Sequence, residues 1–236
     1  MHRHRHLALA SFIKPIALAA VVTCAPLAQA AFTTLTLSTL NFDIRTSSDG
    51  ATYNPLFPGT QTWNGTPFQL AVDSNGNTVF VDGVLDIAVG LFGVTQAYSI
   101  INSGFGAFGS NNGSMEFFGT NGSYYKVDLI QGINIRDHFD NVFNNIIDNV
   151  NAIPAFNVGP GRARFDEQIY TLPAAFANET LNTIRFSGSD LGLNGNPFIA
   201  AATVRTADAT SVPEPGSIAL VLAGLGLAGW QRKRQS

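Results

Sequence analysis

The stretch Ser114-Met115-Glu116-Phe117-Phe118-Gly119-Thr120-Asn121-Gly122-Ser123-Tyr124-Tyr125-Lys126-Val127-Asp128-Leu129 decides the fold class of this sequence. Two segments rich in aromatic and other β-prone residues flank a short connection with two glycines, which is the pattern of a β-hairpin. Ile133-Asn134-Ile135 continues the alternation, so we expect a third strand and a meander. The sequence therefore predicts an all-β fold.

Segments on both sides of this hairpin show the same pattern of short β-prone runs separated by turn residues. We expect 68–72 and 78–81 to form a hairpin around Asn75-Gly76, and 46–67 to be a long loop rich in Ser, Gly, Asn and Pro. Residues 136–150 allow a short helix or a strand and loop, because apolar residues at helical spacing compete with Asn and Asp of low helix propensity. The remaining expected strands are 33–40, 85–90, 94–101, 164–171, 181–187 and 198–206.

The block from 164 to 206 resembles the second half of galactose-binding-like jelly rolls. The resemblance lies in Leu172-Pro173-x-x-Phe176 followed by Leu181-x-x-Ile184, where a loop packs just before a core strand. It implies a jelly-roll β-sandwich and says little about the ligand. We expect a signal-peptide helix before this sandwich and a short hydrophobic helix after it.

The first 30 residues have the three parts of a secretory signal peptide. Arg3, Arg5 and Lys14 make a positive start, residues 15–27 are apolar, and Ala28-Gln29-Ala30 is the small-x-small pattern that signal peptidase recognises. We predict cleavage after Ala30.

The chain has one cysteine, Cys24, which lies within this leader. Thr23 precedes it, whereas a lipoprotein site has a very small residue there, so we favour signal-peptidase cleavage over lipidation. The mature chain then has no cysteine, which excludes disulfides and zinc–thiolate sites.

The exported part is acidic. Without the three basic residues of the leader and the three of the tail, seven basic residues face fifteen acidic ones, a net charge of about −8. This balance argues against nucleic acid and anionic membrane surfaces as partners. It permits cations such as calcium, but we favour the solubility of a secreted protein as its explanation.

The last 25 residues combine Pro213-Glu214-Pro215, an apolar run over 218–230, and the basic cluster Arg232-Lys233-Arg234. At about 1.5 Å per residue the run reaches roughly 20 Å, less than the hydrocarbon core of about 30 Å. Such a helix suits transient insertion into the inner membrane, with the basic stop cluster on the cytoplasmic side. An ordinary tail anchor is the alternative.

This tail closely resembles the PEP-CTERM tripartite sorting signal of Gram-negative bacteria in the order and position of its three parts. The resemblance implies recognition by an exosortase, cleavage near Pro213-Glu214-Pro215, and delivery to the cell surface or extracellular matrix. We therefore divide the chain into a signal peptide (1–30), an exported β-sandwich (31–206), a linker (207–211) and a sorting tail (212–236).

Catalytic motifs are scarce in the exported part. His138, its one histidine, has Asp137 and Asp140 nearby as partners for a base or a cation site, but a single histidine cannot build a multi-histidine zinc site. No Gly-x-Ser-x-Gly motif occurs. Gly104-Phe105-Gly106-Ala107-Phe108-Gly109 matches the dinucleotide fingerprint by letter, but another turn follows where a helix must begin.

Paired carboxylates are the enzymatic alternative, because glycosidases need two acids at a suitable separation. The candidates are Glu116, Asp128, Asp166 and Glu167. Adjacent Asp166 and Glu167 point to opposite faces if they lie in a strand, which disfavours joint action.

Binding is the other class of function. Trp63, Tyr124, Phe105 or Phe108 near Asn-rich loops would stack on a sugar ring, although aromatic residues in strands are more often core.

Asp73, Asn75 and Asn77 alternate like the first ligands of a calcium loop. Thr78 and Val84 stand where an EF-hand needs Gly and Glu, so we favour a plain turn there. No cofactor is expected, and calcium stays open.

We predict a non-catalytic exported protein, processed by signal peptidase and an exosortase, that acts at the surface or in the matrix and binds exopolysaccharide. A secreted carbohydrate-active enzyme is the alternative.

Overall fold

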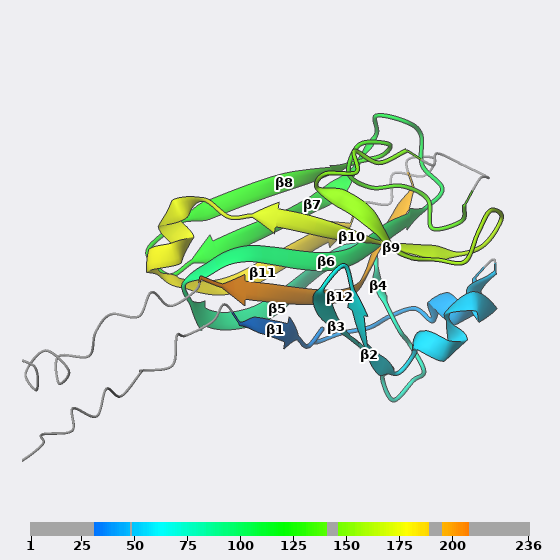
Figure 1. Ribbon diagram of the computed structural model, residues 1–236, viewed down its shortest axis with the longest axis horizontal. Coiled ribbons are helices and arrows are strands. Elements are labelled where there is room, and N and C mark those ends of the chain that lie inside the picture. The colour runs from blue at the N-terminus through cyan, green and yellow to red at the C-terminus, as the bar shows by residue number, and fades with distance from the viewer. Residues whose placement is uncertain (1–30, 48, 141–145, 189–194, 208–236) are drawn as a thin grey trace, which may run out of the picture. The chain divides into compact units, whose positions relative to one another are not determined.

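A computed structural model describes residues 31–47, 49–140, 146–188 and 195–207 of the protein (Figure 1). The predicted signal peptide, the sorting tail and both expected terminal helices lie outside the described residues. Within the described ranges, no helix has the length and apolar character needed to cross a membrane.

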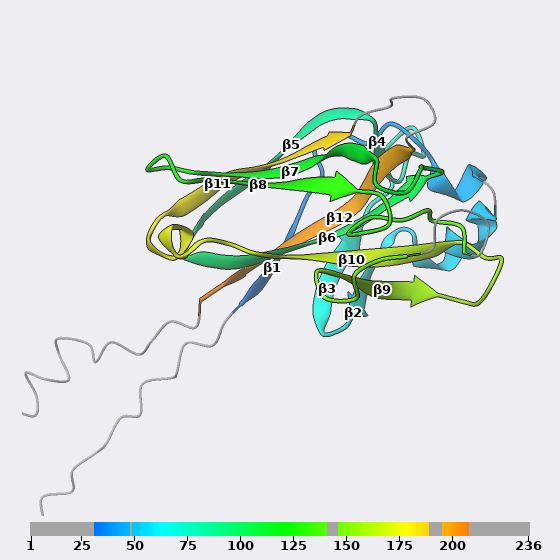
Figure 2. The same cartoon turned by 90° about the horizontal axis from the view of Figure 1, so that it is seen from above.

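Two antiparallel sheets face each other as layers (Figure 2). The larger sheet has the order β1-β12-β6-β10-β9, with β4 also paired to β12, and the smaller has the order β5-β11-β7-β8. The larger sheet contains β1 (Phe32–Leu35), β4 (Phe80–Val81), β6 (Val94–Gly104), β9 (Ala152–Asn157), β10 (Arg164–Thr171) and β12 (Asn196–Thr206). The smaller contains β5 (Gly83–Phe92), β7 (Asn111–Gly119), β8 (Tyr124–Ile130) and β11 (Thr180–Gly188).

The strand order is that of a jelly roll. β1-β12-β6-β10 faces β5-β11-β7-β8, so that the chain crosses repeatedly from one sheet to the other, as two successive Greek keys require. This topology confirms the predicted all-β jelly-roll sandwich. The described elements also include three 3₁₀ helices: η1 (Ile44–Thr46), η2 (Gly50–Leu56) and η3 (Ala174–Asn178).

The main core lies between the two sheets and follows from period-two alternation. Along β5, Leu85 and Ile87 are buried whereas Val84 and Asp86 lie toward solvent. Leu172, Phe176, Leu181 and Ile184, the residues of the jelly-roll resemblance, are all buried in this cluster.

A second apolar cluster covers the outer side of the larger sheet. It joins η2 and the hairpin of β2 (Gly59–Trp63) and β3 (Thr66–Leu70) to the sheet through Tyr53, Phe68, Phe165 and Phe198. β6 and β12 therefore have apolar layers on both sides, and both are buried along most of their lengths.

The hairpin that indicated the fold is confirmed, because β7 pairs with β8 and Phe118 lies opposite Tyr124. The third strand expected at Ile133-Asn134-Ile135 is wrong. The carbonyl of Ile130 accepts hydrogen bonds from the backbone of 133–135, which closes a turn, and β7 instead takes β11 as its second neighbour.

The long loop predicted over 46–67 is also wrong, because it contains η2 and β2. Asn64-Gly65 joins β2 to β3 with φ values of 50° and 86°, the positive values that a two-residue hairpin turn needs. The turn expected at Asn75-Gly76 exists, but the hairpin does not: β3 pairs with β2, and β4 pairs with β12.

Three further differences concern single segments. β1 ends at Leu35, short of the expected 33–40. β9 was not predicted because it contains Pro154; an edge strand tolerates proline, which cannot donate a ladder hydrogen bond. The described part of 136–150 contains isolated bridges and turns and no helix.

The two ends of the described domain meet at one end of β12. Phe32 pairs with Arg205, and the backbone N–H of Thr206 donates to the carbonyl of Ala31 at 3.2 Å. β12 has 11 residues, so at about 3.3 Å per residue its other end, Asn196, is roughly 33 Å away.

Candidate ligand-binding pocket

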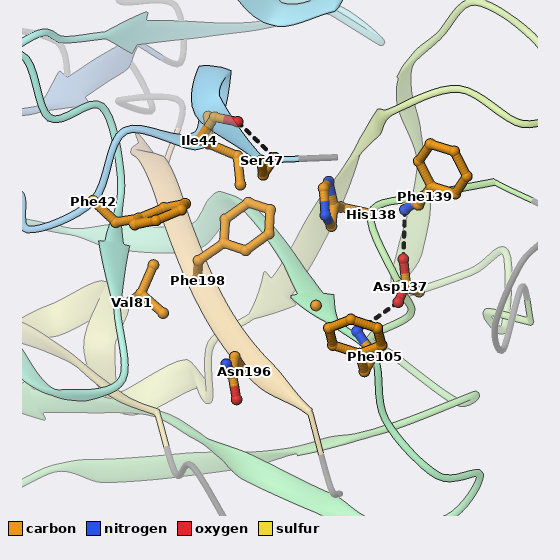
Figure 3. Close-up of a pocket in the computed structure, with 11 residues that line it drawn as sticks. Phe42, Ile44, Ser47, Val81, Phe105, Asp137, His138, Phe139, Asn196 and Phe198 are labelled. Carbon is orange, nitrogen blue, oxygen red and sulfur yellow. Dashed lines mark hydrogen bonds between the residues drawn. The ribbon is translucent and has the colours of Figure 1, made fainter. Parts of the chain in front are cut away.

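A pocket of about 560 Å³ opens at the end of the sandwich where β6 ends and β12 begins (Figure 3). Aromatic and aliphatic side chains make up most of its wall. Its lining residues are Phe42, Ile44, Ser47, Val81, Gly104, Phe105, Asp137, His138, Phe139, Asn196 and Phe198.

A strap made of residues 136–140 carries three of these residues into the pocket. The strap runs between the ends of β6 and β10: the N–H of Ser103 donates to the carbonyl of Arg136, and the N–H of His138 donates to the carbonyl of Ser103 at 2.8 Å. On the other side, the N–H of Arg164 donates to the carbonyl of His138, also at 2.8 Å. The strap is thus hydrogen-bonded as an extra, short strand.

Two buried ion pairs fix the strap. Arg136 forms a bidentate pair with Asp166 at 2.7 and 2.6 Å, and the amide of Asn102 donates to the same carboxylate. Arg164 donates to the carbonyl of Asp137 and pairs with Asp140 at 2.6 Å, although burial lowers the pKa of its guanidinium. Breaking either pair leaves a buried charge uncompensated, so the strap is held in one position.

The protonation state of His138 follows from its contact with Tyr53. The Tyr53 hydroxyl donates its hydrogen to the carbonyl of Arg164 at 2.7 Å, so its oxygen accepts from Nδ1 of His138 at 3.2 Å. Nδ1 therefore carries the proton, and Nε2 keeps its lone pair. Burial, and then the charge of Arg164, lower the pKa of His138 to about 4. The ring is neutral at physiological pH.

Asp137 shapes the backbone on both sides of the pocket. Its carboxylate accepts from the N–H of Phe105 at 2.5 Å and from the N–H of Phe139 at 2.6 Å (Figure 3). Burial raises the pKa of this carboxyl. The carboxylate of Asp137 thus accepts hydrogen bonds from the backbone of two other pocket residues and holds the pocket wall in place.

Phe105 is held in an uncommon conformation at the pocket mouth. Its φ is 67°, a left-handed value that costs a residue with a side chain roughly 1–2 kcal/mol. Asp137 bonds its N–H and the Ser103 hydroxyl donates to its carbonyl at 2.9 Å, which stabilises this conformation. The residue is 58% exposed. A strained backbone conformation and an exposed apolar residue thus coincide at the pocket mouth.

The chemistry available in the pocket is binding through apolar contact and few hydrogen bonds. The Ser47 hydroxyl already donates to the carbonyl of Ile44 at 2.6 Å, and Asn196 is an exposed amide. Among the described residues, the side-chain hydrogen bond that His138 makes is the one from Nδ1 to Tyr53. As a base of pKa about 4, His138 is poorly matched to proton abstraction at neutral pH.

Of the aromatic residues that the sequence indicated, Phe105 reaches the pocket and Phe108 lies exposed on the same loop. Trp63 is half-buried in the second cluster, against Phe68 and Phe165. Tyr124 is exposed at the far end of β7, paired with Phe118. Of the candidate ligand residues, His138 lines the pocket together with Phe105, whereas Trp63 and Tyr124 lie outside its lining.

The candidate cation residues form a turn. Oδ1 of Asp73 accepts from the backbone N–H of Asn75 at 2.9 Å and of Asn77 at 2.8 Å, and Oδ2 accepts from the Asn77 amide. These backbone contacts lower the pKa of Asp73 against the effect of burial. Within the described residues, no group of three or more His, Cys, Asp and Glu is placed to hold a metal.

The four candidate catalytic acids lie outside the pocket lining. Glu116 and Asp128 lie on the outer face of the smaller sheet, where Asp128 pairs with Lys126 at 3.0 Å. Asp166 is bound by Arg136, and Glu167 accepts from Asn64 at 2.9 Å. Adjacent Asp166 and Glu167 contact different groups, as expected for a strand.

Sequence reasoning missed Phe42, Tyr53, Asn196 and Phe198. They come from three separate segments and meet only because β12, η2, the strap and the segment before η1 converge at one end of the sandwich. No local spacing in the sequence signals this convergence.

Comparisons with known proteins address the tail and the fold separately. Residues 211–235 match the family described as the PEP-CTERM protein-sorting motif. The molecule is an all-β sandwich with a loop-end pocket, and its chain carries a PEP-CTERM sorting motif, as the resemblance of Pro213-Glu214-Pro215 predicted. The motif implies an exported, cell-surface or extracellular protein that an exosortase processes.

The search of curated proteins gave no match. Among solved structures, a family two carbohydrate esterase from Cellvibrio japonicus is similar to 75% of this chain, with 8% sequence identity and a TM-score of 0.30. The chain spans about a third (34%) of that protein's structure.

Proposed function

We propose that this exosortase-sorted protein acts without catalysis at the cell surface or in the extracellular matrix, where its loop-end pocket binds a saccharide unit of an extracellular polysaccharide. The observation that carries the proposal is Phe105, which is held at positive φ by Asp137 and Ser103 with its ring exposed at the mouth of the pocket. Exposed aromatic rings bind the apolar face of a sugar ring.

The position of the pocket supports this role. The chain leaves the described domain at Ala207, next to the end of β12 that pairs with β1, and the pocket lies at the other end of β12. The described part of the chain therefore ends at the opposite end of β12 from the pocket.

The placement of the acids supports a non-catalytic role. Glycosidases hold two carboxyl groups about 5–10 Å apart across a cleft. Here Asp166 is neutralised by Arg136, and Asp137 is bonded to two backbone N–H groups. Glu116 and Asp128 lie on an open sheet face. A carbohydrate-active enzyme that uses these acids is the alternative.

A polysaccharide-binding experiment with matched variants tests the proposal. The full chain, purified in mild detergent, is titrated with a panel of bacterial extracellular polysaccharides, together with Phe105→Gly and Tyr124→Ala. Glycine relieves the backbone strain at position 105 and removes the ring, whereas Tyr124 is an equally exposed aromatic residue at the far end of the domain. We expect Phe105→Gly to weaken binding at least about tenfold and Tyr124→Ala to leave it unchanged.

The same experiment has two contradictory outcomes. Binding to no polysaccharide, or equal weakening by both variants, contradicts the assignment of the pocket. Release of reducing ends, lost on substitution of Glu116 or Asp128, establishes the enzymatic alternative instead.

A further inference from the structure

We infer that the pocket selects sugars that carry an acetamido group, the N-acetylated hexosamines, over sugars that carry only hydroxyl groups. This inference deepens the proposed function and rests on it. It follows from the match between the three parts of an acetamido group and the lining of the pocket.

The wall of the pocket is apolar where the ligand must be buried. Ile44 and Phe198 are 3% and 2% exposed, and Val81, Phe42 and Phe139 complete the wall. The two kinds of sugar differ at one substituent, and a hydroxyl buried at that position without a partner costs about 1–3 kcal/mol. The methyl of an acetamido group carries no such cost and gains from burial.

His138 supplies the acceptor that an amide N–H needs. Its side chain is more than nine-tenths buried, and its Nδ1–H is committed to the Tyr53 hydroxyl. His138 lines the pocket, and its Nε2 has one lone pair and no hydrogen. A ligand must bring a donor to this atom, and the N–H of an acetamido group is such a donor.

Asn196 supplies the donor that the acetamido carbonyl needs. Its side-chain amide is exposed at the start of β12 and lines the same pocket. The two amide groups are complementary, because Asn196 can donate through Nδ2 to the carbonyl oxygen. The hydroxyl of Ser47, which also lines the pocket, donates to the carbonyl of Ile44.

The charges around the pocket disfavour an anionic sugar. Arg136 and Arg164 are each paired with a carboxylate, and Asp137 adds a negative charge to the wall. Among the lining residues there is therefore no cationic group that could pair with a uronate or a sulfate. Its volume of about 560 Å³ lies within the range of about 300–1,000 Å³ usual for small-molecule sites.

The test compares sugars that differ at one substituent. The full chain in mild detergent is titrated calorimetrically with the methyl β-glycosides of N-acetylglucosamine, glucosamine and glucose, and with the corresponding galactose series. We expect the N-acetylated member of a series to bind at least about tenfold more tightly than both others.

A variant of His138 locates the selectivity. His138→Asn keeps a donor for the Tyr53 hydroxyl and removes Nε2, so we expect it to reduce the preference for the N-acetylated sugar at least about fivefold. Asn196→Ala, at an exposed position, gives a second variant that does not disturb the buried network, with the same expected direction. Tyr124→Ala is the control and keeps the preference.

The failures of the two proposals are distinguishable. Equal binding of glucoside and N-acetylglucosaminide, or tightest binding of the charged glucosaminide, overturns acetamido selectivity and leaves polysaccharide binding standing. Failure to bind these glycosides while polysaccharide binding persists also overturns it. Loss of binding to every monosaccharide and polysaccharide overturns the proposed function itself.

Discussion

Lowering the pH from 7 to 5 costs the folded protein about 2 kcal/mol through His138 alone. The pKa of this side chain falls from 6.5 to about 4 in the folded state because the ring is buried beside Arg164. Between these pH values the unfolded chain binds more protons than the folded chain, so stability is complete above pH 6.5 and is lost as the pH falls. Each pKa unit corresponds to about 1.4 kcal/mol.

Other groups titrate in the same range, so the prediction is a difference between two proteins. Burial raises the pKa values of Asp137 and Glu167, and these carboxyls contribute stability that is lost as the pH rises. His138→Asn keeps them and removes the imidazole. The measurement is urea unfolding of both proteins at pH 7 and pH 5, followed by tryptophan fluorescence, since Trp63 packs in the second cluster.

We expect the wild type to lose about 2 kcal/mol more than His138→Asn between the two pH values. The same loss in both proteins, to within about 0.5 kcal/mol, refutes a buried neutral His138. It also removes the basis for Nε2 as a hydrogen-bond acceptor in the pocket.

Two further predictions concern stability. Asp166→Ala leaves the buried Arg136 charge uncompensated and lowers the free energy of unfolding by about 3–5 kcal/mol, whereas Asp86→Ala, at an exposed pair, costs at most about 1 kcal/mol; equal losses in urea unfolding contradict the role of the strap. Gly113→Ala lowers the unfolding free energy by about 1–3 kcal/mol more than Gly122→Ala, because a Cβ at 113 meets a backbone oxygen at 1.8 Å and one at 122 meets nothing within 4 Å. Thermal unfolding checks this pair, and similar melting temperatures in both variants count against the close packing of β7 on β11.

Local signals in the sequence were enough for the strands whose partners are near or whose pattern is clean. β7 and β8 pair across one tight connection, and β10 begins and ends where its run of β-prone residues does. β2 and β3 were missed although Asn64-Gly65 is a strong turn signal, because surrounding Pro, Ser and Gly residues suggested a loop. Tertiary packing against Phe165 stabilises this hairpin.

The candidate site was less predictable because its parts are far apart in the chain. Phe105 and His138 were identified by residue type, but Tyr53, which fixes the tautomer of His138, is 85 residues away from it. The sequence shows which residues are acidic and could act as catalysts. It contains no sign that one of them, Asp166, belongs to a buried ion pair with Arg136. Such contacts arise from the topology of the sandwich.

The most direct test of the account is an amide NMR titration of the full chain with oligosaccharides prepared from the extracellular polysaccharide of the cells that export it. The account predicts shift changes concentrated at the pocket, at Ile44, Phe105, His138 and Asn196. Changes concentrated around Tyr124 at the far end of β7, or no changes at saturating oligosaccharide, contradict it.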